Sequence, residues 1–147
     1  METLGWLARG GAGVDARRSA LLEAGAGPAI VAALKHRSDY FAAEATVTLQ
    51  HLAADGAGAD ARRSALIAAG AAPALVAALQ RRPAAVSNSA MAALRAMMTG
   101  DEGVAARRAA ISAALSAVEA ARRAAPAAAA PPLATRPRRP RWRCFGC

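Results

Sequence analysis

The sequence predicts an all-helical protein, an α-solenoid of three-helix repeats that stack on one another. The strongest sign is a period of 45 residues, since Arg17–Leu21 returns as Arg62–Leu66 and more loosely as Arg107–Ile111. Alanine, the best helix former, makes up about a third of the chain. No segment alternates apolar and polar residues as a half-buried strand does. A fixed period of this length is typical of arrays whose units bury their apolar faces against their neighbours.

Residues 1–13 are expected to form the end of a partial repeat, within an array that spans 1–124. The basis is that Leu4–Leu7 aligns with Leu49–Leu52, one period later. An array that begins within a repeat has one apolar face without a neighbour. We therefore expect a longer polypeptide, another molecule or self-association to cover this face.

Two full repeats are predicted, 14–58 and 59–103, and each begins with a short helix that carries an arginine pair. Asp15 and Asp60 stand just before the pairs and are predicted to cap these helices, where a carboxylate also meets the helix dipole. Gly25 and Gly70 are predicted to end them, because glycine readily adopts the left-handed conformation found at helix ends.

The second and third helices of each repeat follow from proline positions and apolar spacing. Pro28 and Pro73 stand where proline is tolerated, in the first turn of a helix. The third helix is predicted to bury one face. This face consists of Phe41, Ala45, Thr48, Leu49 and Leu52 in the first repeat, and of Val86, Ala90, Ala93, Leu94 and Met97 in the second.

Residues 104–124 are predicted to form a degenerate capping repeat. The positions of the helix-ending glycine and the proline hold Leu115 and Val118 here. Without these two breakers the segment should run as one longer helix, which Pro126 ends.

The pattern of these repeats resembles the armadillo repeat family. Ala69–Leu79 and Val86–Met97 carry the motif Ala-Gly-Ala-x-Pro-x-Leu-Val-x-x-Leu, a short break, and Val-x-x-x-Ala-x-x-Ala-Leu-x-x-Leu, with Met97 at its last position; Ala24–Leu52 carries it nearly as well. The resemblance implies a right-handed superhelix whose third helices line a concave groove for extended peptides or partner domains. Members that bind basic peptides carry an asparagine at a position held here by Trp6, His51 and Ala96, so a nuclear-import receptor is disfavoured.

The predicted function is therefore a non-enzymatic module that binds another protein on the third-helix face. Helix phase alone offers five polar residues as contacts there: Glu44, Gln50, His51, Asn88 and Arg95. No set of nucleophile, base and orienting group appears, and we expect no catalytic residue, cofactor or metal. A lone histidine such as His51 is more often a packing residue than a ligand. The arginine pairs are interpreted as a solvated helix face in preference to a basic ridge.

Residues 125–147 are predicted to be a disordered tail rich in proline, alanine and arginine. Its basic residues are Arg136, Arg138, Arg139, Arg141 and Arg143, and it contains no acidic residue. The alternative function is electrostatic recruitment through this tail to nucleic acid or an anionic membrane. Cys144 stands fourth from the end, as in prenylation motifs, but Gly146 and Cys147 fit the motif poorly.

The expected location is inside the cell, in the cytoplasm or alternatively the nucleus. The first residues lack the basic-then-apolar order of a signal peptide, and no stretch is apolar enough to span a bilayer. The two cysteines both lie in the last four residues and cannot form a disulfide framework for the body.

Overall fold

The computed structural model describes residues 2–124, which form eight α-helices and no strand. The helices are α1 (Glu2–Ala8), α2 (Val14–Glu23), α3 (Ala26–Leu34), α4 (Asp39–Leu52), α5 (Ala59–Ala68), α6 (Ala71–Ala78), α7 (Ala84–Met97) and α8 (Val104–Ala124). The predicted all-helical class is confirmed for these residues. The predicted tail, with its five arginines, lies outside them.

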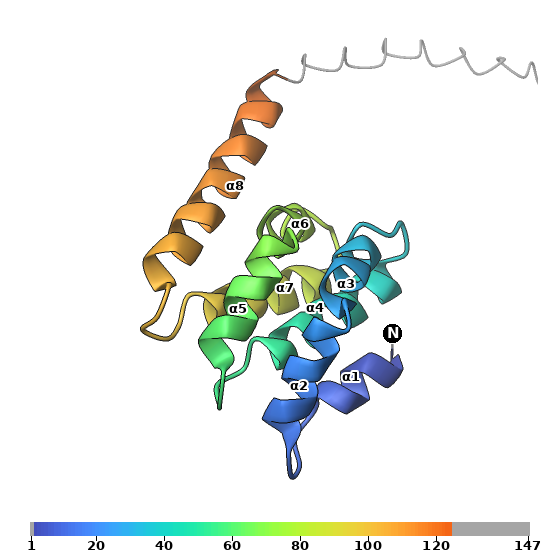
Figure 1. Cartoon of the computed structure of the whole chain (residues 1–147). Coiled ribbons are helices and arrows are strands. Elements are labelled where there is room, and N and C mark those ends of the chain that lie inside the picture. Colours follow the sequence, from blue (N-terminus) through green and yellow to red (C-terminus); the bar gives the residue numbers. More distant parts are fainter. Residues whose placement is uncertain (1, 125–147) are drawn as a thin grey trace, which may run out of the picture.

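The helices recur with the period of the sequence, and each helix packs against its counterpart. α2 and α5 contact each other, as do α3 and α6, while α4 lies between α1 and α7. Figure 1 shows these counterparts following one another across the body, with α8 beyond α5 and α6. α8 contacts both α5 and α6, so a single helix stands where the earlier repeats have a first and a second helix. The single helix predicted for 104–124 is confirmed.

The turns inside the repeats follow the predicted glycine and proline positions. Gly25 and Gly70 have φ values of 83° and 87°, and they separate α2 from α3 and α5 from α6. Pro28 and Pro73 lie in the first turns of α3 and α6, as predicted. Left-handed glycine and first-turn proline are local preferences, so the sequence predicts these boundaries well.

The core is a continuous layer of alanine, leucine, valine and isoleucine side chains between the helices. All five residues predicted for the buried face of α7 are buried, and so are four of the five predicted for α4. The exception is Phe41, which is 42% exposed. It lies in the first turn of α4, where its ring meets His36 edge-on at 5.0 Å and Tyr40 at 5.7 Å. Phe41 therefore packs on the surface at the α3–α4 turn.

The prediction that Asp15 and Asp60 cap their helices is wrong. The residues at the N-caps are Gly13 and Gly58, both in the left-handed conformation, and no side chain caps either helix. The aspartates lie one residue inside the helices, at a position that directs their carboxylates toward the next repeat.

Candidate functional site

The arginine pairs are largely buried, which corrects their interpretation as a solvated helix face. Arg18, Arg62, Arg63 and Arg107 are all buried, and Arg62, Arg63 and Arg107 are each only 2% exposed. Only Arg108 is exposed as predicted, and Arg17 is half-buried. Buried guanidinium groups require hydrogen-bond partners, because burying an unpaired charge is very costly.

The first arginine of each pair binds the end of the preceding third helix. Nε of Arg62 donates to the carbonyl of Leu52 at 3.1 Å, and Nε of Arg107 donates to the carbonyl of Met97 at 2.9 Å. The Nη atoms donate to further carbonyls in the loop that follows, such as Thr99 at 2.8 Å from Arg107. These arginines satisfy carbonyls that have no partner within their own helix.

The same arginines also bind an aspartate of the preceding repeat. Nη2 of Arg62 lies 3.2 Å from Oδ1 of Asp15, and Nη2 of Arg107 lies 2.8 Å from Oδ1 of Asp60. The other carboxylate oxygen accepts a loop N–H: Ala57 donates to Asp15 at 3.0 Å, and Glu102 to Asp60 at 3.2 Å. We call this arrangement the Asp–Arg clamp; one joins α2 to α5 and the other joins α5 to α8.

Glycine is required where each carboxylate meets the loop. A Cβ atom added at Gly56 would overlap the carboxylate of Asp15, and one added at Gly100 would overlap that of Asp60. Both glycines also have positive φ values, 132° and 87°. The glycine-rich linkers are therefore part of the clamp.

The charges in the clamp influence one another. Desolvation raises the pKa of Asp60, but the Glu102 N–H, Arg63 and Arg107 outweigh it and hold that pKa below its ordinary value. Burial lowers the pKa of Arg62, and Asp15 opposes this shift. A carboxyl whose pKa lies below its ordinary value is ionised at neutral pH, so Asp60 carries its negative charge there.

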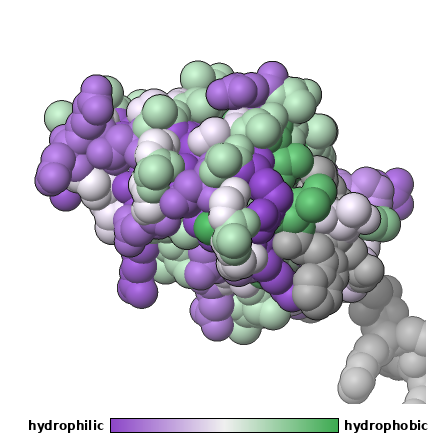
Figure 2. Space-filling view, turned by 60° about the horizontal axis from the view of Figure 1, so that its bottom comes forward, coloured by the Kyte–Doolittle hydropathy of each residue, from purple (hydrophilic) through white to green (hydrophobic). Residues whose placement is uncertain are grey.

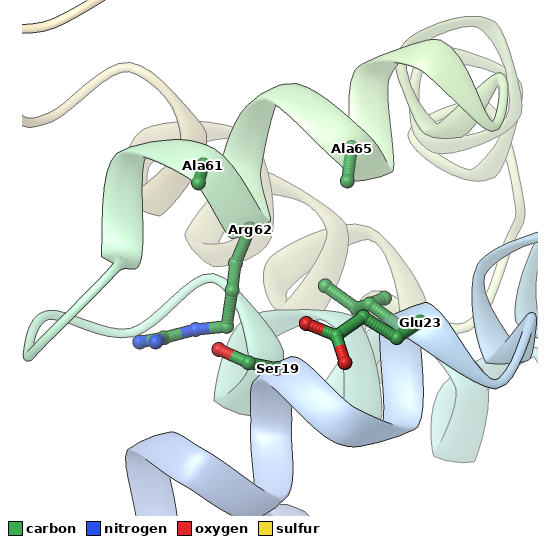
Figure 3. Close-up of a pocket in the computed structure, with 6 residues that line it drawn as sticks. Ser19, Glu23, Ala61, Arg62 and Ala65 are labelled. Carbon is green, nitrogen blue, oxygen red and sulfur yellow. The ribbon is translucent and has the colours of Figure 1, made fainter.

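A hollow of about 230 Å³ lies beside the first clamp, between α2 and α5. Figure 3 shows Ala61 and Ala65 of α5 over Ser19 and Glu23 of α2, with the guanidinium of Arg62 turned away from Glu23. Leu22 completes the lining. Its polar lining residues are Ser19, Glu23 and Arg62.

The five residues predicted for the third-helix face fall on two neighbouring helices. Glu44, Gln50 and His51 are half-buried on α4, and Asn88 and Arg95 are exposed on α7. Glu44 and His51 are two turns apart and share one side of α4. Gln50 and Arg95 hold matching positions in the two repeats, so they lie on a second row.

His51 lies in a basic environment. Desolvation lowers its pKa, and the charges of Arg9 and Arg18 lower it further. His51 is therefore neutral at pH 7, while the surface around it is positive. Figure 2, which turns the α1 and α2 side forward, shows hydrophilic residues over much of this face with small hydrophobic areas between them.

The comparison of this sequence with protein-family models found no match, and the comparison with curated proteins found none either. Among residues 2–124, no group of three or more His, Cys, Asp or Glu side chains is placed to hold a metal ion. None of the helices in that range combines the length and apolar character needed to cross a membrane.

Sequence reasoning missed the Asp–Arg clamp. A signal for it is present, because the separation of 47 residues between Asp15 and Arg62 recurs between Asp60 and Arg107. Each clamp also has a glycine in the linker between its two partners. An aspartate and an arginine that repeat in this way indicate contact between consecutive repeats.

Proposed function

We propose that this chain is a non-enzymatic protein-interaction module, an armadillo-type α-solenoid that binds an extended segment of a partner protein along α4 and α7. The observation that carries the proposal is the side-by-side packing of α1, α4 and α7, which extends one helix face across successive repeats. Such faces are the binding surfaces of repeat proteins.

The composition of the α4–α7 face supports an extended occupant. By helix phase the middle of the face holds Val47 and His51 on α4 and their counterparts Ala92 and Ala96 on α7, and only His51 among them projects far. Polar side chains flank this row on both helices. An extended partner segment that lies over the small side chains of this row approaches the helices closely, and it forms hydrogen bonds with the flanking polar groups.

The charges of this face favour an acidic or neutral partner segment. Arg9 and Arg18 make the surroundings of His51 positive, and Arg95 is exposed on α7. A basic segment would be repelled, because like charges raise the free energy of association.

The test is a selection of unstructured peptides on the immobilised chain, followed by fluorescence anisotropy with the selected peptides. The double variant His51→Ala, Arg95→Ala should weaken binding by about 1–2 kcal/mol, the scale of ordinary interface truncations. Arg108→Ala, an exposed arginine on α8, is the matched control and should bind as the parent does. Unchanged affinity in the double variant would contradict the proposal.

The alternative is electrostatic recruitment by the arginine-rich tail, which is favoured by five arginines without an acidic residue in 126–147. Deleting these residues should remove most affinity for polyanions, and that affinity should fall steeply with salt. Binding of the selected peptides should survive both the deletion and moderate salt. If the deletion abolishes peptide binding and the double variant is silent, the tail is the binding element.

A further inference from the structure

The half of the Asp–Arg clamp that binds the carboxylate occurs a third time, at Arg17 on the outer side of α2. Arg17 holds the position of Arg62 and Arg107, one and two periods earlier. Its Nε donates to the carbonyl of Leu7 at 3.4 Å, and its Nη1 donates to the carbonyl of Ala12 at 2.5 Å. Arg62 and Arg107 make the same two bonds one and two periods later, to Leu52 and Ala57 and to Met97 and Glu102. The guanidinium of Arg17 is therefore held in the orientation in which the other two bind a carboxylate.

The loop before α2 also has the clamp's backbone form. Gly11 has a φ of 110° and stands where Gly56 stands in the next repeat. A Cβ added at Gly56 would overlap an aspartate, whereas one added at Gly11 would meet only Nη2 of Arg17, at 3.7 Å. Ala12 stands at the position whose N–H donates to the aspartate in both later repeats. A guanidinium and a loop N–H, the two groups that bind each clamp aspartate from across the interface, are thus presented together on this surface, beside a glycine that leaves room for a carboxylate.

An apolar hollow of about 240 Å³ adjoins these groups. It is lined by Leu7, Arg17, Ala20 and Leu21, and Leu7 is 43% exposed. The interface between α2 and α5 shows what such a surface accepts. There Leu22 of α2 lines the hollow of about 230 Å³ together with Ala61 and Ala65 of α5, and Ala65 is the counterpart of Ala20. Asp15, which binds Arg62, and Leu22 are seven residues apart and so lie on one side of α2.

We propose that this surface, formed by Gly11, Ala12, Arg17 and the adjoining hollow, binds a helix of another polypeptide that carries an aspartate and, seven residues later, a leucine. The carboxylate would accept hydrogen bonds from Arg17 and the Ala12 N–H, and the leucine would enter the hollow. The two internal clamps are the templates for this contact. The surface differs from the α4–α7 face, so the proposal does not depend on the function proposed above.

A second copy of the chain is a poor occupant. The acidic sides of α2 and α5 are already engaged, with Asp15 bound to Arg62 and Asp60 bound to Arg107. α8 carries Ala105 at the matching position. No outward helix face among residues 2–124 therefore presents a clamp aspartate to Arg17 of another copy. The self-association predicted through the N-terminal face stays a prediction, and it would need contacts other than a clamp with Arg17.

The test uses a fluorescein-labelled peptide that copies residues 14–24 and is held helical by a staple between the positions of Ala16 and Ala20. It should bind the full chain, and Arg17→Gln should weaken binding about tenfold or more, the loss expected for a charge-assisted pair. Arg108→Gln is the control and should change nothing. A peptide with asparagine at the position of Asp15 should lose affinity for the parent chain to the same extent.

Two further variants separate the clamp from other modes of binding. Gly11→Ala places a methyl group where the carboxylate belongs, and it should abolish binding while circular dichroism reports unchanged helicity. Arg17→Glu should bind a peptide with arginine in place of Asp15 better than it binds the original peptide. The proposal would be overturned if the peptide does not bind at ~1 mM chain, or if Arg17→Gln binds the peptide as tightly as the parent chain does. So would a concentration-dependent dimer, seen by sedimentation, that Arg17→Gln abolishes, because the occupant would then be a second copy.

Discussion

Replacing Arg107 by methionine should destabilise the protein far more than the same replacement at Arg108. Arg107 is 2% exposed, and its five N–H groups lie within hydrogen-bond distance of six acceptors, three of which share the two hydrogens of Nη1. Four of these acceptors are the main-chain carbonyls of Asp60, Met97, Thr99 and Glu102, and two are on side chains of α5. Methionine fills a similar volume but donates to none of them.

The magnitude follows from the groups left without a donor. Each buried acceptor without a partner costs roughly 1–3 kcal/mol, and breaking a buried charged pair costs about 3–5 kcal/mol in total. Water reaches some of these carbonyls from the linker, so the individual costs do not add fully. We expect Arg107→Met to lower the free energy of unfolding by about 3–5 kcal/mol, a large part of the roughly 5–15 kcal/mol of a typical domain.

The assay is urea unfolding followed by circular dichroism, with Arg108→Met as the matched control. Arg108 is the next residue of α8 and is exposed, so its loss should stay within about 0.5 kcal/mol. Hydrogen exchange should show lost protection first in α8, whose attachment to α5 the arginine provides. Equal losses in the two variants would refute the reasoning that the buried arginine joins the repeats.

Two further predictions test the rest of the clamp. Because the folded state holds the pKa of Asp60 below its ordinary value of 3.8, its contribution is present above that value and is lost as pH falls through the folded pKa. The stability advantage of the parent over Asp60→Asn should therefore shrink on acidification below about pH 4, as followed by urea midpoints. Gly56→Ala should cost more than Gly25→Ala in the same assay: both residues have positive φ, but only Gly56 meets Asp15, while a Cβ at Gly25 meets no atom within 4 Å. Equal costs would mean that the clamp tolerates a methyl group.

The sequence predicted the helices well because their signals are local. The glycines that separate the first and second helices adopt positive φ, as their lack of a side chain allows, and the prolines lie in first turns. The long final helix followed from the absence of both signals. Each of these features depends on a few neighbouring residues, which periodicity reveals directly.

The environment of the arginine pairs was not predictable from local pattern. The acceptors of Arg62 are mainly the main-chain carbonyls of Leu52, Ala54 and Ala57, whose side chains show nothing of this role. The remaining acceptor, Asp15, is 47 residues away. Local pattern therefore predicts that two adjacent arginines in an alanine-rich helix are exposed to solvent. The arginine stem, which is apolar and long, lets the guanidinium lie under the helix end.

The misplacement of Phe41 has a similar cause. Its spacing relative to Ala45 and Leu49 fits the buried face of α4, but a helix face is buried only where a neighbour covers it. The same point applies to Thr46 of α4, which is fully buried, while its counterpart Met91 of α7 is 41% exposed. Periodicity gives the face of a helix and leaves open how far its neighbours extend.

The clamp also answers a difficulty posed by the composition. Alanine buries little area, so two alanine-faced helices have no bulky side chains to fix one relative position along their length. Asp60 accepts hydrogen bonds from Arg63 of α5, from Arg107 of α8 and from the N–H of Glu102 in the linker just before α8. Sliding one helix along the other by a single residue would break two of these bonds at once. We infer that the core provides most of the burial, while the Asp–Arg clamp fixes the register in which consecutive repeats stack.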